Sequence, residues 1–317
     1  MPLLIIKPAT KIFQVSLFLV EICSCLLDEN RWQPWEYLYL FILFIFIINE
    51  NKAVIIATCF TIILAAIYLY SGLDKFNNNF LTSMWATMIL KRFFKIPALI
   101  YTNKWLHYSG YILWVIESLA GIGLLFSKTK KIAAIMMIVM HLFTLVFIGP
   151  MWVHYNKIVW PWNIAMIMFL YFLFIKNEKI VALNFVSLNG RNKIILLCWS
   201  ILPALNFIGL WDNYLSWNIY SSTLPNLAIC IKDSATSKQF HLYLNKKDSL
   251  NICDGNALLN IQNWAIKEMN VPPYPEERVY KKIEEQWTRD FPLSNVSFVI
   301  YYLPFKPVLP MLKNNSN

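Results

Sequence analysis

The first two thirds of the chain alternate between long apolar stretches and short polar loops, and this pattern constrains the fold more than any other feature. A helix needs about 20 mostly apolar residues to cross a bilayer, with about 17 to 25 tolerated. The last five stretches meet that length, whereas the first two are shorter and have Glu21, Glu36 and Glu50 within or beside them. We therefore expect about seven spans, with six or eight as alternatives. The stretches lie at about 12–27, 36–49, 53–71, 105–126, 131–149, 158–175 and 193–210.

The composition agrees with a multi-pass membrane protein. Of the 317 residues, 58% are hydrophobic and 15% are charged, whereas a soluble domain usually carries about 25% charged residues. The net charge of +10 belongs to the membrane part, because residues 1–210 hold 17 Lys/Arg and 8 Asp/Glu while residues 211–317 hold 11 and 10. Such loop charge does not indicate a nucleic-acid footprint. We expect the lipid bilayer as a partner and no nucleic acid.

The distribution of basic loops predicts the orientation of the chain. With seven spans, four basic groups lie on one side, which we assign as cytoplasmic together with the N-terminus. Everything after residue 210 then lies outside the cytoplasm. The loop before the fourth stretch is an exception, because this topology places its basic residues outside. They are Lys91, Arg92, Lys95 and Lys104. We interpret residues 81–100 as an amphipathic segment that lies on the membrane surface or re-enters the membrane.

The pattern changes after residue 210. Short runs of β-forming residues predict strands at 227–231, 240–244 and 296–303, and helical spacing predicts helices at 256–269 and 276–290. The fold class is therefore an all-α polytopic membrane helix bundle, residues 1–210, followed by a small α+β extracytoplasmic domain, residues 211–317.

The cysteines and histidines suggest one covalent link and no metal site. Cys230 and Cys253 both fall in the α+β domain, where a disulfide would be permitted outside the cytoplasm, but their spacing alone does not show whether they are close. The four histidines are scattered along the chain without ligand spacing, so no metal is predicted.

An acid and an amine stand side by side where the third apolar stretch ends. The sequence YLYSGLDKFNNNF, residues 68–80, places Asp74 next to Lys75. Ionisable groups at a membrane segment usually face protein or water. Lys75 is either a desolvated amine that serves as a base, or a lysine that reaches the lipid headgroups or pairs with Asp74.

Two further ionisable residues lie inside predicted spans. Glu117 is in the fourth stretch and His141 is in the fifth. A helix pair could bring them together, and both a structural pair and a proton relay fit that arrangement. Candidate residues for a substrate pocket are Asp74, His154, Trp160 and Asn163, although an aromatic belt at the membrane interface explains most of the tryptophans around His154 equally well.

Two stretches resemble a known family. SGLDKFNNNFL, residues 71–81, is similar to the AG-x-x-K-L-[DN]-x-D-W pattern of vitamin K-dependent γ-glutamyl carboxylases and their bacterial relatives, the horizontally transferred transmembrane (HTTM) proteins. ESLAGIGLLFSKTKKIAAIMMIVMHLFTLVFIGPMWVHYNKIVWPW, residues 117–162, resembles the family's next block. RWQPWEYLYLF, residues 31–41, is similar to an earlier segment, W-x-x-H-x-Y-L-Y. The likeness covers about residues 30–175, and the DoxX-like quinone-linked membrane proteins share some of the same helix patterns.

This resemblance implies a role for Lys75. In the carboxylases the matching lysine is the base that deprotonates vitamin K hydroquinone, so the likeness implies Lys75 as the catalytic base, with Glu117 and His141 as tuning or relay groups. A quinone or quinol is the cofactor compatible with it, and the bacterial inner membrane is the implied location. Trp35 occupies the position of the family's histidine, and residues 211–317 are too few for the large lumenal domain, so protein carboxylation is not expected.

Two functions remain from the sequence. The first is a membrane enzyme that acts on a lipid-soluble quinol-type substrate. The second is a non-catalytic membrane subunit that anchors its C-terminal domain and presents residues 211–317 to a protein partner. A transporter ranks last, because no matched pair of broken helices marks two inverted halves.

Overall fold

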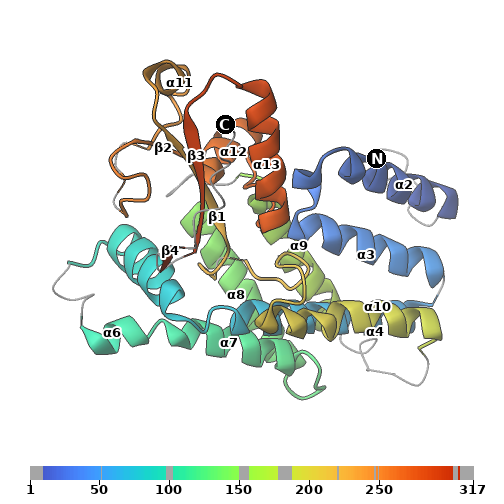
Figure 1. Cartoon of the computed structure of the whole chain (residues 1–317). Helices are drawn as coiled ribbons and strands as arrows, with labels where there is room; N and C mark the ends of the chain where they lie inside the picture. Colours follow the sequence, from blue (N-terminus) through green and yellow to red (C-terminus); the bar gives the residue numbers. More distant parts are fainter. Residues whose placement is uncertain are drawn as a thin grey trace. The chain divides into compact units, whose positions relative to one another are not determined.

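The computed structural model describes residues 10–50, 52–97, 103–149, 157–177, 188–219, 221–245, 248, 250–302 and 306–307. The chain forms two compact units, Met1–Ser221 and Ser222–Asn317. This boundary lies eleven residues later than the expected one at 210/211, because Trp217 is fully buried in the helical core. Its ring lies 5.1 Å from that of Trp199. Figure 1 shows the helices of the first unit and the sheet of the second.

All the regular elements described in the first unit are helices. Its elements are α2 (Lys11–Leu27), η1 (Glu29–Arg31), α3 (Pro34–Ile48), α4 (Ala53–Leu73), η2 (Phe80–Phe93), α6 (Lys104–Tyr108), α7 (Tyr111–Gly123), α8 (Lys130–Ile148), α9 (Val159–Leu170), η3 (Tyr171–Lys176), α10 (Gly190–Ser200) and η4 (Leu202–Ile208).

Four helical segments in the described residues are long and apolar enough to cross a membrane. They are Ala53–Leu73, Lys130–Ile148, Val159–Lys176 and Gly190–Ile208. The other three expected spans correspond to shorter helices: α2 has 17 residues, α3 has 15, and the fourth stretch is divided into α6 and α7. The structure thus supports a membrane protein with four candidate spans, and the count of seven stays a prediction.

Helix α4 is the centre of the first unit. Two thirds of its most apolar 18-residue stretch is buried, compared with about a third or less of the same stretch in the other three candidate spans. It packs most extensively on α7. The two helices are antiparallel, because Gly72 lies against Ser118 while Gly121 lies against Ala65 and Leu69. Small residues allow such close approach of helix backbones.

The second unit contains an antiparallel sheet with strand order β2-β1-β3-β4. Successive side chains of a strand point to opposite faces, so β1 contributes to two clusters. Leu227, Ile229 and Ile231 pack with residues of α12 and α13, whereas Ala228 and Cys230 pack with Ile252, Cys253 and Leu258. The elements are β1 (Asn226–Ile231), α11 (Ser234–Gln239), β2 (Ala257–Asn260), α12 (Ile261–Met269), α13 (Glu277–Asp290), β3 (Val296–Tyr302) and β4 (Lys306–Pro307).

The structure confirms the strands expected near 227–231 and 296–303 and the helix near 276–290, but it corrects two other elements. The expected strand at 240–244 is wrong: Phe240 is the C-cap of α11, residues 241–243 form turns, and Leu244 makes only an isolated bridge with Leu259. Asp233 caps the start of α11 by accepting the Thr236 N–H at 2.8 Å. The expected helix at 256–269 begins only at Ile261, because Leu258 and Leu259 pair with β1. Asn260 then caps α12 through the Asn263 N–H at 3.0 Å.

Candidate functional site

A buried ion pair joins α4 to α7. Lys75 follows the last turn of α4, and its Nζ lies 2.6 Å from Oε2 of Glu117. The Lys75 Nζ also donates to the backbone oxygen and to the hydroxyl of Ser71, both at 2.8 Å. The side chains of Lys75 and Glu117 are only 13% and 7% exposed. The ammonium group therefore has three acceptors for its three N–H donors.

The close packing of α4 on α7 creates this pair. Gly72 has no side chain to hold α7 away, so the backbone nitrogen of Ser118 approaches to 2.8 Å of where a Cβ would stand. The Ser118 hydroxyl also donates to the Leu69 carbonyl at 3.4 Å. Glu117, the residue before Ser118, is thereby brought close to Lys75, which follows the C-terminal end of α4.

Asp74 does not pair with Lys75. It is 9% exposed, and its Oδ2 is buried without a hydrogen-bond partner among the described residues. Its backbone oxygen accepts from the Asn77 side chain at 2.7 Å. A buried carboxylate oxygen without a partner is costly, so Asp74 is an unsatisfied acceptor directly beside the ion pair in sequence.

His141 lies in a second polar cluster rather than against Glu117. Its Nε2 is 2.8 Å from the hydroxyl of Tyr68, and its Nδ1 is 2.7 Å from Oδ1 of Asn163. The Asn163 side-chain nitrogen donates to the Val159 carbonyl at 2.8 Å, so the amide oxygen faces the histidine. From this network we assign the Nδ1–H tautomer, in which Nε2 accepts the Tyr68 proton.

The two clusters share one face of α4. Tyr68, Ser71 and Lys75 are spaced three and four residues apart, which places them on the same side of a helix, and about 10 Å separates Tyr68 from Lys75 along the helix axis. In place of the expected pair of Glu117 with His141, Glu117 pairs with Lys75 just after α4, and His141 pairs with Tyr68 of α4.

The remaining candidates are dispersed. His154 lies outside the described residues. The Trp160 indole donates to the Ile148 carbonyl at 3.2 Å, a contact between α9 and α8. Trp35 packs on Trp162 with ring centroids 6.1 Å apart. Among the described residues, no group of three or more His, Cys, Asp or Glu side chains is arranged to hold a metal ion.

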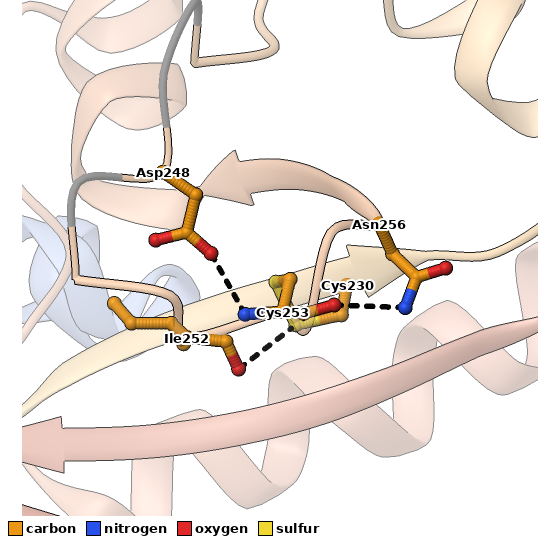
Figure 2. Close-up of a disulfide and its surroundings, with 5 residues drawn as sticks. All are labelled: Cys230, Asp248, Ile252, Cys253 and Asn256. Carbon is orange, nitrogen blue, oxygen red and sulfur yellow. Dashed lines mark hydrogen bonds between the residues drawn. A yellow bond between two sulfur atoms is a disulfide. The ribbon is translucent and has the colours of Figure 1, made fainter.

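Cys230 and Cys253 form a disulfide in the second unit, with Cα atoms 5.2 Å apart. Figure 2 shows the loop that positions Cys253: Asp248 accepts its backbone N–H at 2.8 Å, and the Asn256 side chain donates to its carbonyl at 2.8 Å. The disulfide links β1 to this loop across the face of the sheet.

Sequence reasoning assigned no role to Tyr68 and Ser71. Their spacing from Lys75 is a signal that could have identified them, because polar residues at helical intervals on an apolar helix face mark the side turned to the protein. Trp199 and Trp217 were also missed. Both indoles are almost completely buried, and neither N–H has a partner among the described residues.

Comparison with known proteins found no matching family model, no matching curated protein and no matching solved structure.

Proposed function

We propose that the first unit is a membrane enzyme of the HTTM class that acts on a lipid-soluble quinol-type substrate, with Lys75 as its base. In this proposal the chain crosses the bacterial inner membrane about seven times, with its N-terminus cytoplasmic and its second unit extracytoplasmic. The buried Lys75–Glu117 ion pair carries the proposal, together with the likeness of residues 71–81 to the family's lysine-centred motif. Ionisable residues inside a membrane bundle are expensive to maintain and are usually functional.

The geometry provides a place for the proton. A lysine acts as a base only after its ammonium loses a proton, and Glu117 Oε2 at 2.6 Å is within reach of a direct transfer. The resulting neutral amine would accept the phenolic proton of a quinol. Asp74, with its unsatisfied Oδ2, is a second carboxylate close in sequence to which a proton could pass.

Tyr68, His141 and Asn163 have a supporting role in this proposal. The histidine is neutral in the assigned tautomer and receives a hydrogen bond from Tyr68 on the face of α4 that also carries Lys75. It would either relay a proton along that face or hold α8 and α9 in place beside α4.

The test compares the purified full chain with Lys75→Ala and Lys75→Arg variants. Activity is measured in detergent under air as oxidation of a reduced short-chain ubiquinone analogue and, separately, of vitamin K hydroquinone. Lys75→Ala should abolish a rate that is present in the natural chain, and Lys52→Ala, which removes an exposed lysine before α4, should not. Full activity of the Lys75→Ala variant would refute the proposal.

A specific observation favours a second candidate, the non-catalytic membrane subunit. Every N–H donor of Lys75 and both ring nitrogens of His141 already have partners in the protein, as expected for structural polar contacts between helices. The second unit has its own core and disulfide, and its PPYPEERVYKK segment, a rigid turn leading into the charged helix α13, suits a protein contact. Affinity purification should then recover a stoichiometric partner, which deletion of residues 222–317 removes.

A further inference from the structure

One end of the first unit is built from the chain between α4 and α7. Because these helices are antiparallel, the last residue of α4 and the first residue of α7 lie at the same end, and residues 74–110 connect them there. Lys52 before α4 and Lys128 after α7 mark the opposite end.

Beyond Asp74 and Lys75, the chain at this end carries basic residues and no acid. Residues 76–116 contain four Lys/Arg and no Asp or Glu. Lys91, Arg92 and Lys104 are exposed, and the described residues provide none of them with an ion pair. Within the described part of the chain, Arg92 donates only to the sulfur of Met88, at 3.7 Å. These cations are therefore available to an external anion.

Exposed aromatic side chains stand among these cations. Trp105 is 87% exposed, and Phe94 and Tyr108 are each 53% exposed. Tyr108 stacks on Tyr111 with ring centroids 6.2 Å apart, which continues the aromatic row onto α7. Such rings are costly in water, but they are favoured at the level of lipid headgroups.

Two contacts hold η2, α6 and the start of α7 together. The Trp85 indole of η2 donates to the Leu106 carbonyl of α6 at 2.8 Å. Gly110 lets the same indole lie against the start of α7, since a Cβ there would stand 2.5 Å from the ring. Leu81, Ala86 and Leu90 are buried, so η2 has an apolar side toward the protein and a basic end that is exposed.

We infer that these residues form a binding surface for anionic phospholipid headgroups of the adjacent leaflet. The basic-aromatic surface comprises Lys91, Arg92, Phe94, Lys104, Trp105 and Tyr108. The lipid leaflet is the occupant favoured here because the surface adjoins candidate spans and combines cations with interfacial aromatic residues, as membrane-surface segments do. The inference does not depend on the proposed enzyme activity.

The experiment measures lipid retention by the full-length protein. The protein is purified in micelles that contain equal amounts of phosphatidylcholine and phosphatidylglycerol, and the retained lipids are quantified by mass spectrometry. Each basic residue near an anionic leaflet contributes about five-fold to binding. The Lys91→Gln/Arg92→Gln/Lys104→Gln variant should therefore lose up to roughly 100-fold in its preference for phosphatidylglycerol.

Two further variants complete the test. Lys91→Arg/Arg92→Lys/Lys104→Arg keeps the charges and should retain the preference, which separates lost binding from lost folding. Lys52→Gln/Lys128→Gln/Lys193→Gln removes the same charge from exposed sites elsewhere and should also retain it. Equal loss in this last variant, an unchanged preference in the first, or displacement of the lipid by inorganic phosphate at the same concentration would overturn the inference.

Discussion

Lys75 and Glu117, which are 42 residues apart in the chain, form a buried ion pair 2.6 Å long between the end of α4 and the middle of α7. The exposed pair of Lys11 with Glu50 is a useful comparison. Its Nζ and Oε2 atoms are 3.6 Å apart, and its side chains are 55% and 50% exposed. The two pairs differ in burial and in length, and the difference in burial makes the energetic role of the first one testable.

Removing one partner of the buried pair should be strongly destabilising. Glu117→Gln leaves the Lys75 ammonium without its counter-charge, at a cost of about 3–5 kcal/mol. Glu50→Gln should cost no more than about 1 kcal/mol, because exposed pairs contribute little. Unfolding in mixtures of detergent and dodecyl sulfate measures both variants. The double replacement Lys75→Met/Glu117→Leu should recover much of the loss, and a loss equal to that of Glu117→Gln alone would contradict this account.

Helix packing at Gly121 should not tolerate a methyl group. A Cβ at this position would stand 2.7 Å from the backbone atoms Ala65 O and Leu69 N, so α4 and α7 must separate. Gly121→Ala should destabilise the first unit by about 1–3 kcal/mol. Gly190→Ala is the control, because nothing lies within 4 Å of its Cβ position, and it should be neutral or stabilising by up to about 1 kcal/mol. Equal effects at both glycines would refute the packing argument.

The Tyr68–His141–Asn163 network should show a single histidine tautomer. Nitrogen NMR of histidine-labelled protein should find His141 protonated at Nδ1, because Asn163 Oδ1 accepts there at 2.7 Å. Tyr68→Phe removes the donor to Nε2 and should cost about 1–3 kcal/mol, because a buried acceptor is left unsatisfied. Thr144→Val, which removes a hydroxyl that donates to the Met140 carbonyl of its own helix, should leave the His141 spectrum unchanged. A signal from the Nδ1-deprotonated form would contradict the assignment.

The disulfide should stabilise the second unit. Cys230 and Cys253 are separated by 23 positions, and closing a loop of that size in the unfolded chain contributes about 3 kcal/mol. Cys230→Ala/Cys253→Ala should lower the protection of amides in β1 and β3 of the full chain against hydrogen exchange. Cys198→Ala, which removes a free cysteine of the first unit, should leave that protection unchanged. Unaltered protection in the double variant would show that the link does not stabilise the sheet.

Asp233 should make the second unit sensitive to acid. Its carboxylate accepts the Thr236 N–H at 2.8 Å and the Asn295 N–H at 2.9 Å. These two hydrogen bonds, that of Thr236 most, hold the pKa of Asp233 below its ordinary value. The folded pKa lies below the unfolded one, so the stabilisation is complete above the unfolded pKa of about 3.9 and is lost as the pH falls through the folded pKa. Asp233→Asn should weaken this acid dependence. Hydrogen exchange measured between about pH 2 and 6, the range over which such stabilisation is lost, tests this. Asp290→Asn, which removes a carboxylate bonded to the Gln286 side chain, should not.

Much of the architecture follows from local pattern. The apolar stretches predict the helices of the first unit because length and hydropathy suffice to define a helix in a membrane. Short runs of β-forming residues likewise predict β1 and β3. The two misplaced elements have different causes. At 256–269 the cap Asn260 sets where α12 starts, and apolar periodicity does not reveal it. At 240–244 the chain forms turns after α11, and only Leu244 of these residues bridges to Leu259.

The amino-acid sequence by itself determined which groups were costly to bury: Lys75, Glu117 and His141 stand out because charge and imidazole are rare among apolar stretches. Only the tertiary structure decided their partners. Glu117 meets Lys75 and His141 meets Tyr68, because Gly72 and Gly121 set the antiparallel offset of α4 on α7 and α8 packs beside them. That offset depends on side chains from several helices at once, and no single stretch of sequence contains it.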